Sequence, residues 1–127
     1  MKFSIDKHEK YVLLKLNEAK LNSLIAPIVK SEFILINTEG IRNIIIDLAD
    51  VKFCDSSGLS CLLVAHRLCK SSGGVFIVTG LQPTVEKLIK ISQLDNVFTI
   101  IASVEESIDL VFMEEIEKEL KKDTGTV

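Results

Sequence analysis

The sequence predicts an α/β fold, with one small domain built on a mixed β-sheet of about five strands and about four helices. Strand-like and helix-like apolar segments alternate through the second half of the chain, as in parallel strands joined by helices. The apolar run from Ile44 to Leu48 is rich in β-branched residues, which is typical of a central strand covered on both faces. The 127 residues fit one such domain and can hold a core without disulfides or metal.

The first part of the chain predicts an edge hairpin followed by a helix. Residues 2–6 and 10–16 show fair apolar alternation and are joined by a short polar connection, so we expect two antiparallel strands. A helix is expected after Asn22 or Ser23, either of which can cap it. Pro27 falls in its first turn, where a missing N–H does least harm, and Gly40 is a stop signal.

The remaining elements follow as alternating strands and helices. In chain order they are a strand at 43–48, a helix at 57–71, a strand at 75–80, a helix at 82–92, a strand at 96–101 and a helix at 103–122. Ser103 and Glu106 have the spacing of a capping box at the start of the last helix. We expect residues 1–122 to form the domain and residues 123–127 to be a flexible tail.

Composition narrows the function classes. Hydrophobic residues make up 47% and charged residues 26% of the chain, unlike a disordered protein. The net charge of −3 offers no basic footprint for nucleic acid. The charged N-terminus lacks an apolar signal region, and no apolar run approaches the length of a membrane span. We therefore expect a cytoplasmic protein that does not insert into membranes and does not bind nucleic acid directly.

The cysteines and histidines give no sign of a metal or cofactor site. Cys54, Cys61 and Cys69 are odd in number, form no C-x-x-C pair and lie in or beside apolar segments. His8 and His66 are isolated from other ligand types. We expect no metal and no cofactor, a reducing compartment, and cysteines that act as small core residues.

Asp55, Ser56, Ser57 and Gly58 stand where a strand gives way to a helix. Their chemistry leaves two interpretations open: a helix cap, which Asp and Ser often provide, or a site that receives a phosphate. On the expected helix, the residues on the side of Ser56 are Ser60, Val64 and Arg67. The stripe that should face the sheet is Leu62, Ala65 and Cys69.

A serine hydrolase is the enzymatic alternative for this turn. It would need a base and an orienting acid beside the nucleophile, and the chain offers only His8 and His66. The turn reads D-S-S-G, whereas a nucleophile elbow requires G-x-S-x-G. We therefore expect no enzymatic activity.

The stretch D-S-S-G-L after "DLADVKFC", the "GG" before the next strand and the chain length together resemble the STAS domain of bacterial anti-sigma factor antagonists. The resemblance covers nearly the whole chain. It implies that Ser56, with Ser57 as the competing position, is phosphorylated by a partner that is both an anti-sigma factor and a serine kinase. The unphosphorylated protein would bind that partner and release a sigma factor, so regulating transcription. A PP2C-type phosphatase would reverse the modification.

The resemblance and the helix spacing together also predict a partner surface. Its expected members are Asp55, Ser56, Ser57, Gly58, Ser60, Val64, Arg67 and Asn22. Asn22 stands in a loop where the family often has an aspartate, so the family's negative charge is missing there. The alternative functions are an accessory STAS subunit of a lipid ABC transporter, docked on its ATPase, and a nucleotide-binding protein. We expect a monomer or a weak dimer.

Overall fold

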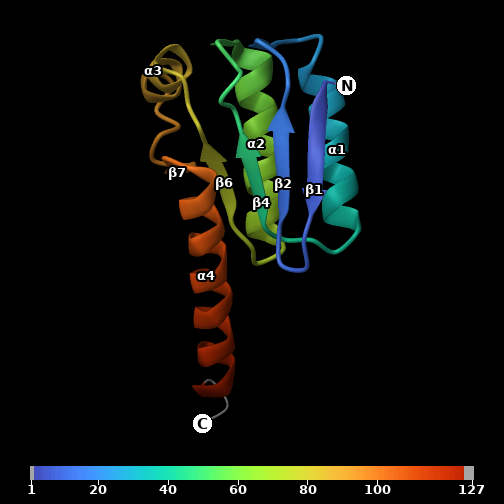
Figure 1. The fold of residues 1–127 in the computed structure, drawn as a ribbon, viewed down its shortest axis with the longest axis vertical. Coiled ribbons are helices and arrows are strands. Elements are labelled where there is room, and N and C mark those ends of the chain that lie inside the picture. The colour runs from blue at the N-terminus through green and yellow to red at the C-terminus, as the bar shows by residue number, and fades with distance from the viewer. Residues whose placement is uncertain (1, 125–127) are drawn as a thin grey trace.

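The computed structural model describes the backbone of residues 2–124 and the side chains of residues 2–121. Strands and helices alternate along most of the chain (Figure 1). The strands are β1 (Phe3–Lys7), β2 (Val12–Leu16), β3 (Lys20–Leu21), β4 (Ile44–Asp47), β5 (Phe53–Cys54), β6 (Phe76–Thr79) and β7 (Thr99–Ile101). The helices are α1 (Ala26–Thr38), α2 (Ser56–Ser71), α3 (Pro83–Ile91) and α4 (Val104–Thr124).

The main sheet is mixed, with five strands in the order β1-β2-β4-β6-β7. β1 pairs antiparallel with β2 and forms one edge, whereas β2, β4, β6 and β7 are parallel. The branched run lies at the centre, with Ile44 opposite Val12 on one side and Phe76 on the other. The predicted fold class, edge hairpin and central strand are therefore confirmed.

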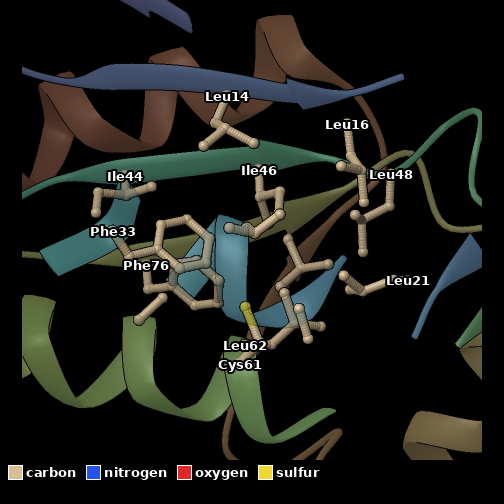
Figure 2. Close-up of a cluster of buried hydrophobic side chains, with 14 of the residues drawn as sticks. Leu14, Leu16, Leu21, Phe33, Ile44, Ile46, Leu48, Cys61, Leu62 and Phe76 are labelled. Atoms are coloured by element: carbon tan, nitrogen blue, oxygen red, sulfur yellow. The ribbon is translucent and has the colours of Figure 1, made fainter. Parts of the chain in front are cut away.

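Helices cover both faces of the sheet, which explains why β4 is apolar on both sides. Ile44 and Ile46 join the larger core with α1 and α2, whereas Ile45 packs in a second cluster that includes Val111 of α4. Figure 2 shows Phe33 and Phe76 together in the larger core, where their ring centroids are 5.9 Å apart. The predicted buried stripe of α2 is also confirmed, because Leu62, Ala65 and Cys69 are buried.

Two short strands were not predicted. β3 and β5 form a separate parallel pair in which Lys20 lies opposite Phe53 and Leu21 opposite Cys54. Each strand has only two residues, which is too few to show a periodic pattern. Their pairing matters because β5 leads directly into α2.

Some helix and strand ends differ from the predicted ones. α1 begins at Ala26 with Ile25 as its N-cap, so neither Asn22 nor Ser23 is the capping residue. Asn22 instead accepts hydrogen bonds from the backbone N–H groups of Leu24 and Ile25, at 3.1 and 3.3 Å, and holds the turn before the helix. β7 starts at Thr99, because residues 95–97 form a turn.

The last helix is longer than predicted, and hydrogen bonds attach it to the rest of the domain. It continues to Thr124, and residues 125–127 of the expected tail lie outside the described residues. The Glu115 carboxylate is buried and accepts hydrogen bonds from Arg42 at 2.9 and 3.2 Å and from Asn43 at 3.2 Å. This clamp ties α4 to the residues that lead into the central strand.

Candidate functional site

The start of α2 is capped by Asp55. Its backbone is extended, and its Oδ1 accepts a hydrogen bond from the N–H of Gly58 at 3.0 Å. The carbonyl of Asp55 accepts the N–H of Leu59, also at 3.0 Å. The capping interpretation is therefore right for Asp55. Ser56 is exposed, and its hydroxyl makes no hydrogen bond to any described residue. The capping hydrogen bond at the start of α2 therefore does not involve Ser56.

The β3–β5 pair fixes the position of this helix start. The N–H of Asp55 donates to the carbonyl of Leu21 at 3.3 Å, which continues the pairing of the two strands by one more bond. Gly58 then packs so closely that a Cβ atom there would lie 2.5 Å from the carbonyl oxygen of Leu21 and 2.6 Å from Sγ of Cys54. A glycine is needed here because the first turn of α2 touches the backbone of β3.

A groove of 420 Å³ runs between the first turns of α1 and α2. Four residues of the predicted partner surface line it: Ser56, Ser57, Ser60 and Val64. The rest of the lining is Cys61 and the residues that α1 and its preceding turn contribute, namely Ser23, Ala26, Pro27 and Lys30. Sequence reasoning did not predict that residues of α1 line this groove, because no pattern in the sequence indicates that α1 lies beside α2.

Two predicted surface residues lie apart from the groove. Arg67 is exposed, but it follows Ser56 by eleven positions, which is about 16 Å along a helix. Asn22 lines a separate hollow of 350 Å³ together with Lys20 and Leu24. The structure thus brings Ser56, Ser57, Ser60 and Val64 together, with Asp55 and Gly58 beneath them, and leaves Arg67 and Asn22 outside that group.

The electrostatics at the start of α2 favour an anion. The backbone N–H groups of Ser56 and Ser57 have no acceptor among the described residues, as expected for the first turn of a helix. The positive end of the helix dipole adds to them. Among the described residues that line the groove, Lys30 is the one that carries a charge. The carboxylate of Asp55 is already engaged by Gly58.

The described cysteines and the histidine near the groove are poorly placed for catalysis. Burial raises the pKa of the Cys54 and Cys61 thiols to about 12, so both stay protonated near neutral pH. His66 lies ten residues beyond Ser56, about 15 Å along the helix, with its ring against Phe98. Burial lowers the pKa of His66, and the nearby Lys70 and Arg67 lower it further. It is too distant to activate the Ser56 hydroxyl.

Within the described part of the chain, no three His, Cys, Asp or Glu side chains are grouped so that they could hold a metal ion. A search of the same residues finds no helix with the length and apolar character needed to span a bilayer.

Known proteins share this fold and this arrangement of elements. A profile of the STAS domain family matches residues 3–107. A provisionally assigned anti-sigma factor antagonist from Thermotoga maritima is 26% identical, with a TM-score of 0.78 over 86% of this chain and 93% of that one.

The anti-sigma factor antagonist SpoIIAA in its unphosphorylated form is 22% identical, with a TM-score of 0.69 over 86% of this chain and 96% of that one. The phosphorylated form of the Bacillus cell-fate determinant SpoIIAA is similar at 24% identity, with a TM-score of 0.69 over 86% of this chain and 98% of that one. At these identities the two SpoIIAA structures show the fold alone.

Proposed function

The chain belongs to the STAS domain family, and on this premise we propose that it is an anti-sigma factor antagonist controlled by phosphorylation of Ser56. Unphosphorylated, it binds an anti-sigma factor that is also a serine kinase, and a sigma factor is released. Phosphorylated, it dissociates, and a PP2C-type phosphatase restores it. The protein is then a substrate and a binding partner in the cytoplasm and has no catalytic activity of its own.

The observation that carries this proposal is the division of roles between Asp55 and Ser56. Asp55 caps the helix, and the hydroxyl of the adjacent Ser56 is exposed and makes no hydrogen bond to the described residues. A kinase can reach such a hydroxyl, and its modification breaks no internal hydrogen bond. Ser57 is the competing position, but it is half-buried and therefore less accessible.

The fold can bear a phosphate at this position. A phosphoserine carries about −1.5 to −2 charges at neutral pH and three acceptor oxygens. At Ser56 it would lie beside the unpaired N–H groups of the first turn and the positive end of the α2 dipole. SpoIIAA, whose fold is similar, has both an unphosphorylated and a phosphorylated form, and each matches this chain with a TM-score of 0.69.

The same charge would weaken the binding of a partner that docks over the groove. Binding would move the phosphate out of water and against the partner surface, where an unmatched charge costs several kcal/mol. A penalty of about 2.7 kcal/mol already lowers the affinity roughly a hundredfold. Asp55 lies next to Ser56 and would add to the repulsion of any acidic group on the partner.

The test compares binding of the cognate anti-sigma factor to four forms of the protein by calorimetry. Ser56→Asp should bind about a hundredfold more weakly than wild type, and Ser56→Ala should bind as well as wild type. Ser71→Asp is the matched control, because it places the same charge on an exposed serine at the far end of α2. Equal losses for Ser56→Ala and Ser56→Asp would contradict the charge mechanism. Binding to a transporter ATPase in place of an anti-sigma factor would favour the accessory-subunit alternative.

A further inference from the structure

The C-terminal helix is much longer than the sheet that supports it. Its 21 residues span about 31 Å, whereas the central strand of four residues spans about 13 Å. Figure 1 shows that α4 projects well past the end of the sheet. Its buried side ends at Glu115, where the carboxylate meets Arg42 and Asn43. None of the residues from 116 to 121 is buried.

The outward side of α4 carries an apolar stripe. Met113, Ile116 and Leu120 follow one another by three and four positions, so they lie on one side of the helix. Met113 is 66% exposed, and Ile116 and Leu120 are each 60% exposed. They lie about half a turn from Val111 and Glu115, which face the sheet. We call these three residues the outer stripe.

The charge around the outer stripe is predominantly negative. α4 contains eight acidic and three basic residues, a balance of −5 in a chain whose net charge is −3. Asp109, Glu117 and Glu119 are exposed near the stripe. Of the described lysines of α4, Lys118 lies 3.9 Å from Glu115 and Lys121 lies 3.4 Å from Glu117, so both contact carboxylates of their own helix.

We infer that the outer stripe is a docking surface for a basic amphipathic helix of a partner protein. Such a helix would bury Met113, Ile116 and Leu120 against its own apolar face and place Lys or Arg side chains beside the acidic flanks. A second copy of this chain fits less well, because an antiparallel pair centred on Ile116 would bring Glu117 close to its own symmetry mate. An anionic membrane surface would be repelled by the same charges.

This surface is separate from the Ser56 site. α2 begins at the carboxyl ends of the parallel strands, and α4 runs back along the sheet and projects beyond their amino ends (Figure 1). One partner can therefore occupy the groove beside Ser56 while another holds the outer stripe. Occupation of the outer stripe does not depend on the proposed phosphorylation.

The test uses a fluorescent synthetic peptide of about 18 residues, with leucine on one helical side and lysine on the flanks, and measures anisotropy with the full chain. A matched peptide has glutamate in place of every lysine. The lysine peptide should bind, with an affinity that falls as salt is raised, and the glutamate peptide should not. Ile116→Ser should weaken binding roughly tenfold, as should Glu117→Lys.

Leu24→Ser and Asp95→Lys are the matched controls, because both residues are exposed and lie outside α4. They should leave the affinity unchanged, and so should Ser56→Asp, which separates this inference from the proposed switch. Equal binding of the two peptides, or equal losses in the controls, would overturn the inference. It would also be overturned if sedimentation showed a dimer that Ile116→Ser dissolves, or if the chain bound anionic vesicles through α4.

Discussion

Gly58 is the position at which a single methyl group should disturb the site most directly. In Gly58→Ala the new Cβ would lie 2.5 Å from the carbonyl oxygen of Leu21 and 2.6 Å from Sγ of Cys54. Since non-bonded carbon contacts are comfortable only near 3.5 Å, the start of α2 must retreat by roughly 1 Å. The hydrogen bond from Asp55 to Leu21, already 3.3 Å long, would then be strained or lost.

The expected change in the free energy of unfolding is the sum of opposing contributions. Overpacking of this kind costs about 1–3 kcal/mol, and the lost hydrogen bond adds about 1 kcal/mol. Replacing glycine by alanine inside a helix stabilises the helix by about 1 kcal/mol, which offsets part of this loss. The free energy of unfolding should therefore fall by about 1–3 kcal/mol, which lowers the Tm by roughly 4–12 °C for a domain of this size.

Urea denaturation followed by circular dichroism measures this change. Ser60→Ala is the control, because Ser60 is exposed on the same helix and alanine adds no atom to the serine side chain. It should change the free energy of unfolding by no more than about 0.5 kcal/mol. A Gly58→Ala variant as stable as wild type, or more stable, would refute the reasoning that close packing against Leu21 fixes the start of α2.

Three further predictions concern the cap, the clamp and the thiols. Asp55→Ala should lower the free energy of unfolding by about 1 kcal/mol, whereas Asp55→Asn should keep most of the cap; urea denaturation of both compares them. The arginine that donates to Glu115 holds the pKa of this carboxyl below its ordinary value of 4.5. The clamp should thus contribute its full stability above pH 4.5 and lose it as the pH falls through the lower folded pKa. Glu115→Gln should cost about 1–3 kcal/mol at pH 7 and flatten this acid dependence in urea curves recorded from acid to neutral pH; an unchanged slope would count against the clamp. Cys54, Cys61 and Cys69 are buried with pKa values raised to about 12, so a thiol reagent at pH 8 should react only after denaturant is added.

The predictable parts of the fold were those with a repeating pattern or a local chemical rule. The branched run at 44–48 predicted a strand covered on both faces, and the sheet places it at the centre. Leu62, Ala65 and Cys69 recur at helical spacing, and all three face the core. A helix cap was one of the two interpretations that the sequence left open for the Asp55 turn, and the structure has a cap at Asp55.

Features that depend on contacts between distant segments could not be predicted in the same way. β3 and β5 have two residues each and are joined only when residues 20–21 meet residues 53–54. Lys30 lines the groove because α1 lies beside α2. Patterns within one segment of the sequence do not predict which two helices pack together. Glu115 belongs to a run of charged residues that is typical of a solvent-exposed helix face. In the structure its carboxylate is buried because it accepts hydrogen bonds from Arg42 and Asn43.

The exposed hydroxyl beside an already satisfied cap is the centre of the account, and one measurement tests it most directly. The purified chain is incubated with its cognate anti-sigma factor kinase and ATP, and the modified peptide is mapped by mass spectrometry. We predict a single phosphate on Ser56, no labelling of Ser56→Ala, and full labelling of Ser57→Ala. A phosphate on Ser57, or undiminished labelling of Ser56→Ala, would contradict the account.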